Sequence, residues 1–169
     1  MVFDMNWPEI FASGPWFGFA ALGFAVLFNV PPRTLVAIWL LGFAGGFVKL
    51  VMLALGLGPV MASLLGASTI GVLSIPAAHN KHAPPMVFSI AAVIPMVPGV
   101  FAYRTMIGLV QLTGEVDSAY QQALSETINN GAKAVFILMA LAVGVGLPNI
   151  ITRKESAKEM KLGKTKAAG

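Results

Sequence analysis

The stretch from Arg33 to Leu55 reads RTLVAIWLLGFAGGFVKLVMLAL, and between its two end residues only Lys49 is charged. A helix rises 1.5 Å per residue, so about 20 apolar residues cross the hydrocarbon core of a bilayer. Pro31-Pro32 precede this stretch and Gly56-Leu-Gly-Pro59 follows it, and both segments interrupt a helix. The stretch therefore predicts one transmembrane helix.

The composition of the whole chain agrees with a membrane protein. Hydrophobic residues make up 57% of the 169 residues and charged residues 11%, against roughly 25% charged residues in soluble domains. The mean hydropathy is +0.80. Eleven basic and seven acidic side chains could not cover that much apolar surface in a soluble fold. The sequence thus predicts an all-α integral membrane protein, and its lack of cysteine excludes disulfides and thiolate metal sites.

Prolines and glycines divide the chain into five predicted spans. The spans cover about residues 8–28, 33–55, 59–78, 86–112 and 118–151, with the buried part of the fifth at about 131–151. A polar loop, His79 to His82, separates the third span from the fourth. Small residues four apart, such as Gly42 and Gly46, predict close packing between helices. We expect one transmembrane domain over residues 1–151, followed by a basic tail over 152–169.

The distribution of charge predicts the orientation of the chain. Five spans place the two termini on opposite sides. With the tail inside, the inner segments hold Arg33, Lys81 and six basic tail residues. The outer segments then hold only acidic charges, at Asp4, Glu9, Glu115 and Asp117. The positive-inside rule predicts an outer N-terminus and a cytoplasmic C-terminus in the cell (inner) membrane. The basic tail suits anionic lipid headgroups and not nucleic acid.

The fourth predicted span contains the most informative motif, Ala92-Val-Ile-Pro95-Met-Val-Pro98-Gly99. Pro95 lies roughly 14 Å from the cytoplasmic end of this span, near the middle of the bilayer. The two prolines break the helix, and the freed carbonyls need hydrogen-bond donors in protein or in a water-filled cavity. In transporters such breaks form substrate sites, with the outer half-helix aimed at a carboxylate. A kink that serves only packing is the alternative.

Four ionisable residues fall within or near the apolar spans. These are Lys49, Arg104, Glu126 and Lys133. A charge at a helix centre costs about 2.5–3.5 kcal/mol, so each of them needs a partner or water. Arg104, beside Tyr103, could pair with an anionic substrate or with Glu126. Snorkelling to the outer interface is the alternative for Lys49 and Arg104.

A polar stripe marks the fifth predicted span. Gln122, Glu126, Asn129 and Lys133 recur at helical spacing and so share one helix face. This face meets a cavity or another subunit, unless this part of the helix projects beyond the membrane.

Signals of catalysis are absent from the sequence. His79 and His82 are the two histidines, and without a neighbouring carboxylate or cysteine they make a weak metal site. The sequence contains no nucleophile–base arrangement, phosphate-binding loop or zinc-helix motif. We expect no enzymatic activity, no metal and no cofactor.

Two segments resemble a known family. They are Gly23-Phe-Ala-Val-Leu-Phe-Asn-Val-Pro-Pro-Arg33 and Ala91-Ala-Val-Ile-Pro-Met-Val-Pro-Gly-Val-Phe-Ala-Tyr103. The chain resembles, over about residues 10–150, the small five-span subunit of the split threonine/serine exporters. The matching positions are Phe24, Asn29, Pro31, Pro95, Pro98, Gly99 and Tyr103. Arg104 departs from the family pattern, which has a small polar residue there. We also expect Asn29 to face a cavity or another subunit.

The resemblance implies a function and a partner. It implies export of small carboxylate-bearing metabolites, either threonine and serine or succinate, and a larger partner subunit with a cytoplasmic domain and five spans. We therefore expect half of a secondary exporter energised by the proton gradient, with Pro95, Pro98, Gly99, Tyr103 and Arg104 at the substrate site. The alternatives are a non-transporting subunit that scaffolds a membrane complex and a small homo-oligomeric channel.

Overall fold

The computed structural model describes residues 7–81, 83–114 and 119–166, with residues 119 and 152–166 described by their backbone alone. All regular structure in these ranges is helical. The elements are α1 (Trp7–Leu27), the 3₁₀ turn η1 (Pro32–Thr34), α2 (Leu35–Ala54), α3 (Pro59–Lys81), α4 (Pro85–Val93), the 3₁₀ turn η2 (Ile94–Met96), α5 (Gly99–Leu112) and α6 (Ala119–Lys166). Four helices are long and apolar enough to cross a membrane, and a fifth candidate span joins α4, η2 and α5 across a 50° bend. The predicted all-helical membrane fold is confirmed.

The ends of α1 and α2 are built in the same way. Asn29 and Gly56 follow these helices with φ values of 54° and 85°. The next residue in each case donates its N–H back across the last turn, from Val30 to the Ala25 carbonyl and from Leu57 to the Met52 carbonyl, both at 3.0 Å. This left-handed cap satisfies carbonyls that the helix end would otherwise leave free. Asn29 therefore terminates α1.

The predicted loop at His79–His82 is wrong for its first three residues. His79, Asn80 and Lys81 form the last turn of α3, and His82 lies outside the described residues. Nothing in this segment breaks a helix before Pro84-Pro85, and the Lys81 ammonium suits the negative end of the helix dipole.

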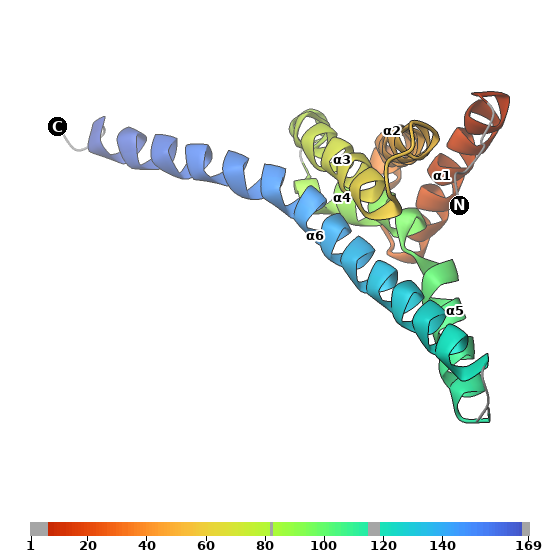
Figure 1. Ribbon diagram of the computed structural model, residues 1–169. Coiled ribbons are helices and arrows are strands. Elements are labelled where there is room, and N and C mark those ends of the chain that lie inside the picture. Colours follow the sequence, from red (N-terminus) through yellow and green to blue (C-terminus); the bar gives the residue numbers. More distant parts are fainter. Residues whose placement is uncertain (1–6, 82, 115–118, 167–169) are drawn as a thin grey trace.

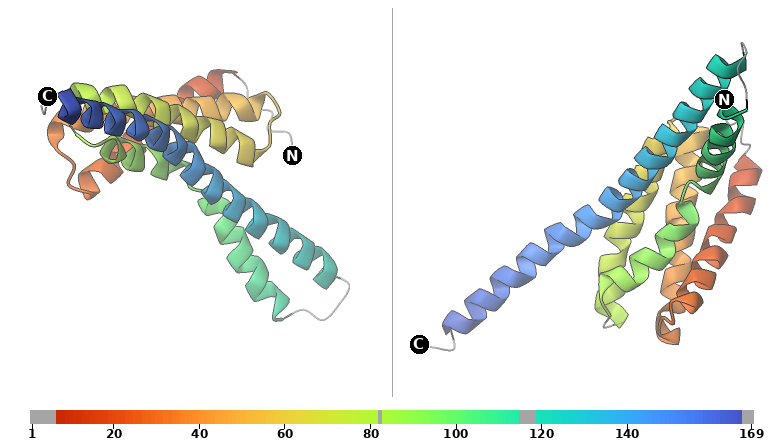
Figure 2. Two further views of the ribbon diagram at one scale, coloured as in Figure 1. Left: turned by 90° about the vertical axis from the view of Figure 1, so that its left-hand side faces the viewer. Right: turned by 90° about the horizontal axis from the view of Figure 1, so that it is seen from below.

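The longest helix, α6, joins two parts of the molecule (Figure 1). Its 48 residues would span about 72 Å at 1.5 Å per residue, more than twice the hydrocarbon thickness of about 30 Å. Its first part pairs with α5 and a later part packs on α3. Figure 2 shows α5 and the first part of α6 leaving the bundle together.

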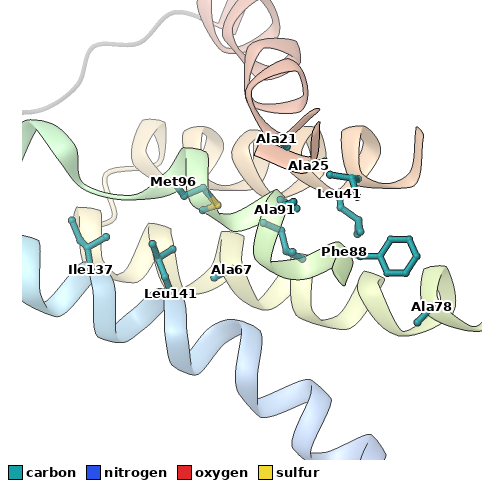
Figure 3. Close-up of a cluster of buried hydrophobic side chains, with 13 residues drawn as sticks. Ala21, Ala25, Leu41, Ala67, Ala78, Phe88, Ala91, Met96, Ile137 and Leu141 are labelled. Carbon is teal, nitrogen blue, oxygen red and sulfur yellow. The ribbon is translucent and has the colours of Figure 1, made fainter. Parts of the chain in front are cut away.

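The central element of the bundle is α4. It contacts α1, α2, α3 and α6, and Phe88, Ala91 and Ala92 on α4 are at most 1% exposed. Figure 3 shows Phe88, Ala91 and Met96 enclosed by core residues of these surrounding helices. Other helices cover the face of α4 that carries Phe88, Ala91 and Ala92, and the buried Met96 places one side of the break that follows against protein.

The predicted close packing of small residues is present. A Cβ added to Gly42 would lie 2.6 Å from the Ala21 Cβ across the α1–α2 crossing. One added to Gly71 would lie 2.8 Å from the Gly144 carbonyl oxygen across the α3–α6 crossing. Backbones can approach this closely only where side chains are small or absent.

Candidate functional site

The chain between α4 and α5 is not α-helical. After η2, Val97 adopts extended angles, with φ −57° and ψ 136°, and α5 begins at Gly99. The Gly99 N–H donates to the Val97 carbonyl at 2.9 Å, so this N–H is occupied. Pro98 is buried and Pro95 is half-buried, whereas Gly99 is exposed and a Cβ added to it would meet no atom within 4 Å.

A lysine from another helix contacts this break. The Lys49 ammonium on α2 donates a hydrogen bond of 3.0 Å to the carbonyl of Met96, the last residue of η2. Lys49 therefore faces the break and does not snorkel to the interface. A hydrogen bond to a charged group contributes about 1.5–3 kcal/mol, which offsets much of the cost of about 2.5–3.5 kcal/mol for a charge at the centre of a span.

Two glycines bring Lys49 to the break. A Cβ added to Gly66 on α3 would lie 2.6 Å from the Met96 Cε, 2.7 Å from the Gly45 carbonyl oxygen and 3.2 Å from the Lys49 Cβ. Gly45 on α2 would in turn meet the Gly66 carbonyl oxygen at 3.0 Å. The backbones of α2 and α3 thus approach each other closely at Gly45 and Gly66, and the side chains of Ile70 and Met96 pack against these two glycines. This contact was missed because it depends on which helices cross, although the sequence did place Lys49 among the charges that need a partner or water.

A second polar feature lies between α5 and α6. It is a groove of about 430 Å³ that is open on one side. Its lining residues are Arg104, Ile107, Gly108, Gln111, Gln122, Ala123, Glu126, Thr127 and Asn130. The Gln122 amide donates to the Glu126 carboxylate at 3.2 Å. Arg104 and Glu126 share this groove, but no ion pair joins them.

The residues predicted for the substrate site lie in two different places in the structure. Pro95, Pro98, Gly99 and Tyr103 do not line the groove that Arg104 lines. Tyr103 lies on α5 with 67% of its surface exposed. Arg104 therefore belongs with the α5–α6 groove and not with the break.

The predicted polar stripe on α6 is likewise divided. Gln122 and Glu126 line the groove, whereas Asn129 is exposed outside it and Asn130 takes its place. The Lys133 ammonium lies 5.8 Å from the centre of the Phe101 ring on α5, a distance suited to a cation–π contact. Most of the stripe thus faces α5.

Within the described ranges, no group of three or more His, Asp or Glu side chains could hold a metal ion. The site that remains is a helix break that is exposed at Gly99 and has the half-buried Lys49 ammonium bonded to its Met96 carbonyl. The four or five apolar candidate spans define a multi-pass α-helical membrane protein, and the hydrogen bond between Lys49 and the Met96 carbonyl is a polar contact between helices of this bundle.

The family described as Threonine/Serine exporter, ThrE, matches residues 16–151. The chain belongs to the threonine/serine exporter family, a family of membrane exporters and not of enzymes. The resemblance seen in the two sequence segments is therefore confirmed.

A relative is an uncharacterized protein of Haemophilus influenzae, 35% identical over 153 residues. The match covers 89% of this chain and 47% of the relative, so the chain spans about half the length of that protein. No solved structure matches the chain.

Proposed function

We propose that this chain is one half of a secondary exporter of small amino or carboxylic acids, of the threonine/serine or succinate type. The observation that carries the proposal is the Lys49 ammonium bonded to the Met96 carbonyl at the helix break. A cation and a freed carbonyl inside a membrane bundle are the groups with which transporters hold small polar substrates. The chain acts in the cell (inner) membrane and uses the proton gradient.

The proposed second half is a larger subunit with a cytoplasmic domain and five spans. Two observations support it. The relative from Haemophilus influenzae has about as much sequence again outside the matched region. The groove between α5 and α6 presents Arg104, Gln122 and Glu126 at the side of the bundle, where lipid would leave polar groups unsatisfied. Two five-span halves of opposite orientation form a recurring transporter design.

The proposed topology counts α4, η2 and α5 as one broken fourth span. The N-terminus then lies outside and the C-terminus in the cytoplasm. Because the chain has no cysteine, single cysteines can map this orientation. We expect a membrane-impermeant maleimide to label Gly58→Cys and Gly114→Cys in intact cells, and Asn80→Cys only after permeabilisation. The reverse pattern would contradict the orientation.

The same reagent tests whether the break is a transport site. Gly99 is exposed with open space around it, so Gly99→Cys should react with a water-soluble maleimide and be protected by substrate. Leu40→Cys should remain unlabelled because Leu40 is exposed on the surface of an apolar candidate span, a surface that we expect to meet lipid. A scaffold subunit predicts a dry break, so an unreactive Gly99→Cys in an assembled complex would favour that alternative.

A further inference from the structure

The charge of Lys49 is not neutralised by any acidic side chain in the described part of the chain. Its ammonium has three N–H donors, and its one hydrogen bond goes to the Met96 carbonyl. The other two intramembrane cations are placed differently. Arg104 lines the α5–α6 groove and Lys133 lies over the Phe101 ring. Of these three cations, Lys49 is thus the one that contacts the break.

A buried hydroxyl group lies on the helix that crosses Lys49. Ser63 on α3 is fully buried, and its hydroxyl has no hydrogen-bond partner among the described residues. Ser63 precedes Gly66 by three residues and so shares its helix face. That face meets Met96 and the Lys49 Cβ at Gly66. The sequence places Ser63 one helical turn from the contact between Lys49 and the break.

The free hydroxyl of Ser63 is unusual among the buried hydroxyls of the described residues, since the other buried ones donate to backbone carbonyls. Serine and threonine in helices commonly bond the carbonyl four residues back, as Ser89 does to Pro85 at 3.2 Å and Thr127 does to Ala123 at 2.7 Å. Buried side-chain polar groups nearly always have a partner. A buried hydroxyl without a partner, one helical turn from the contact between a cation and a helix break, is an arrangement that a ligand would complete.

We propose that Lys49 and Ser63 bind the carboxylate of the exported acid. The inference rests on the proposed function and assigns its binding residues. An ammonium and a hydroxyl both donate hydrogen bonds, and a carboxylate accepts up to four. A carboxylate attracts Lys49 more strongly than a neutral carbonyl does. Substrate would therefore draw Lys49 from the Met96 carbonyl and release the break, which links occupancy of the site to the position of α5.

The test uses the complex of both halves in proteoliposomes and counterflow of radiolabelled L-threonine, L-serine and succinate. Lys49→Met keeps the side-chain length without the charge and should raise KM by about tenfold or more, as expected when an ionic hydrogen bond to substrate is lost. Lys49→Arg keeps the charge and should retain counterflow. Lys81→Met, at the end of α3, is the matched control and should behave as wild type.

Ser63→Ala separates a binding role from a structural one. Removing a hydroxyl that has no partner should leave the thermal unfolding midpoint unchanged or higher. If Ser63 binds substrate, KM rises several-fold in the same protein, by about the loss of one hydrogen bond. If Ser63 had only a structural role, KM would not rise while the thermal unfolding midpoint stayed unchanged.

Wild-type KM in both Lys49→Met and Ser63→Ala would overturn the inference but would not contradict the proposed export function. If the wild-type complex moves none of the three acids, the proposed function fails instead. Binding of the same acids is then measured by calorimetry. An acid that binds wild type and not Lys49→Met supports the site, and no binding to wild type overturns it.

Discussion

Replacing Pro95 and Pro98 together by alanine should lower export by at least about tenfold, which corresponds to about 1.4 kcal/mol of lost transition-state stabilisation. Alanine supplies the N–H groups that proline lacks and does not clash with the preceding turn. The segment 94–98 can then continue α4 into α5 as a regular helix. The Met96 carbonyl would accept a helical N–H, and Lys49 would lose its place at the break.

The double variant should still reach the membrane and assemble, because a continuous helix is at least as stable as a broken one. Export is therefore normalised to the amount of assembled complex. Pro76→Ala is the matched control, since Pro76 lies inside α3 and away from the break. Wild-type export by a well-assembled Pro95→Ala, Pro98→Ala protein would show that the motif is a packing kink.

The boundaries of the helices were largely predictable because local chemistry determines them. The predicted span 8–28 is observed as Trp7–Leu27 and the predicted span 33–55 as Leu35–Ala54. In both cases a residue with positive φ, followed by proline, ends the helix. The error at His79–Lys81 has the same origin, because polarity alone does not stop a helix and the first real stop is Pro84.

The position of the break was predictable for the same reason, since Pro95 and Pro98 act on their own backbone. The side chains that contact the break were not predictable from the sequence. The contact of Lys49 with Met96 depends on the crossing of α2 and α3 at Gly45 and Gly66, residues far apart in the sequence.

Helical geometry explains why the predicted site residues separate. At about 100° per residue, five residues turn a helix to a direction about 140° from the start. Arg104 therefore points away from the side of Gly99 and into the α5–α6 groove. Neighbours differ by about 100° in the same way, which is why Asn130 lines the groove and Asn129 does not.

The second large effect concerns the chain by itself, which we expect to export nothing. A polar groove of about 430 Å³ opens at the side of the α5–α6 pair, where membrane helices would expose Arg104 and Glu126 to lipid. The cost of an unpaired intramembrane charge favours a protein surface there. Because the chain spans about half of its relative, the surface is expected from a second half.

The most direct measurement is substrate counterflow in proteoliposomes that hold this chain alone, the proposed larger five-span partner alone, or both together. The account predicts background flux of threonine, serine and succinate from either chain alone, and saturable flux of at least one of these acids from the pair. The same lipid, the same protein mass and a Lys49→Met pair serve as controls. Robust counterflow from this chain alone would contradict the account and indicate a homo-oligomer, and no flux from the pair would indicate a scaffold.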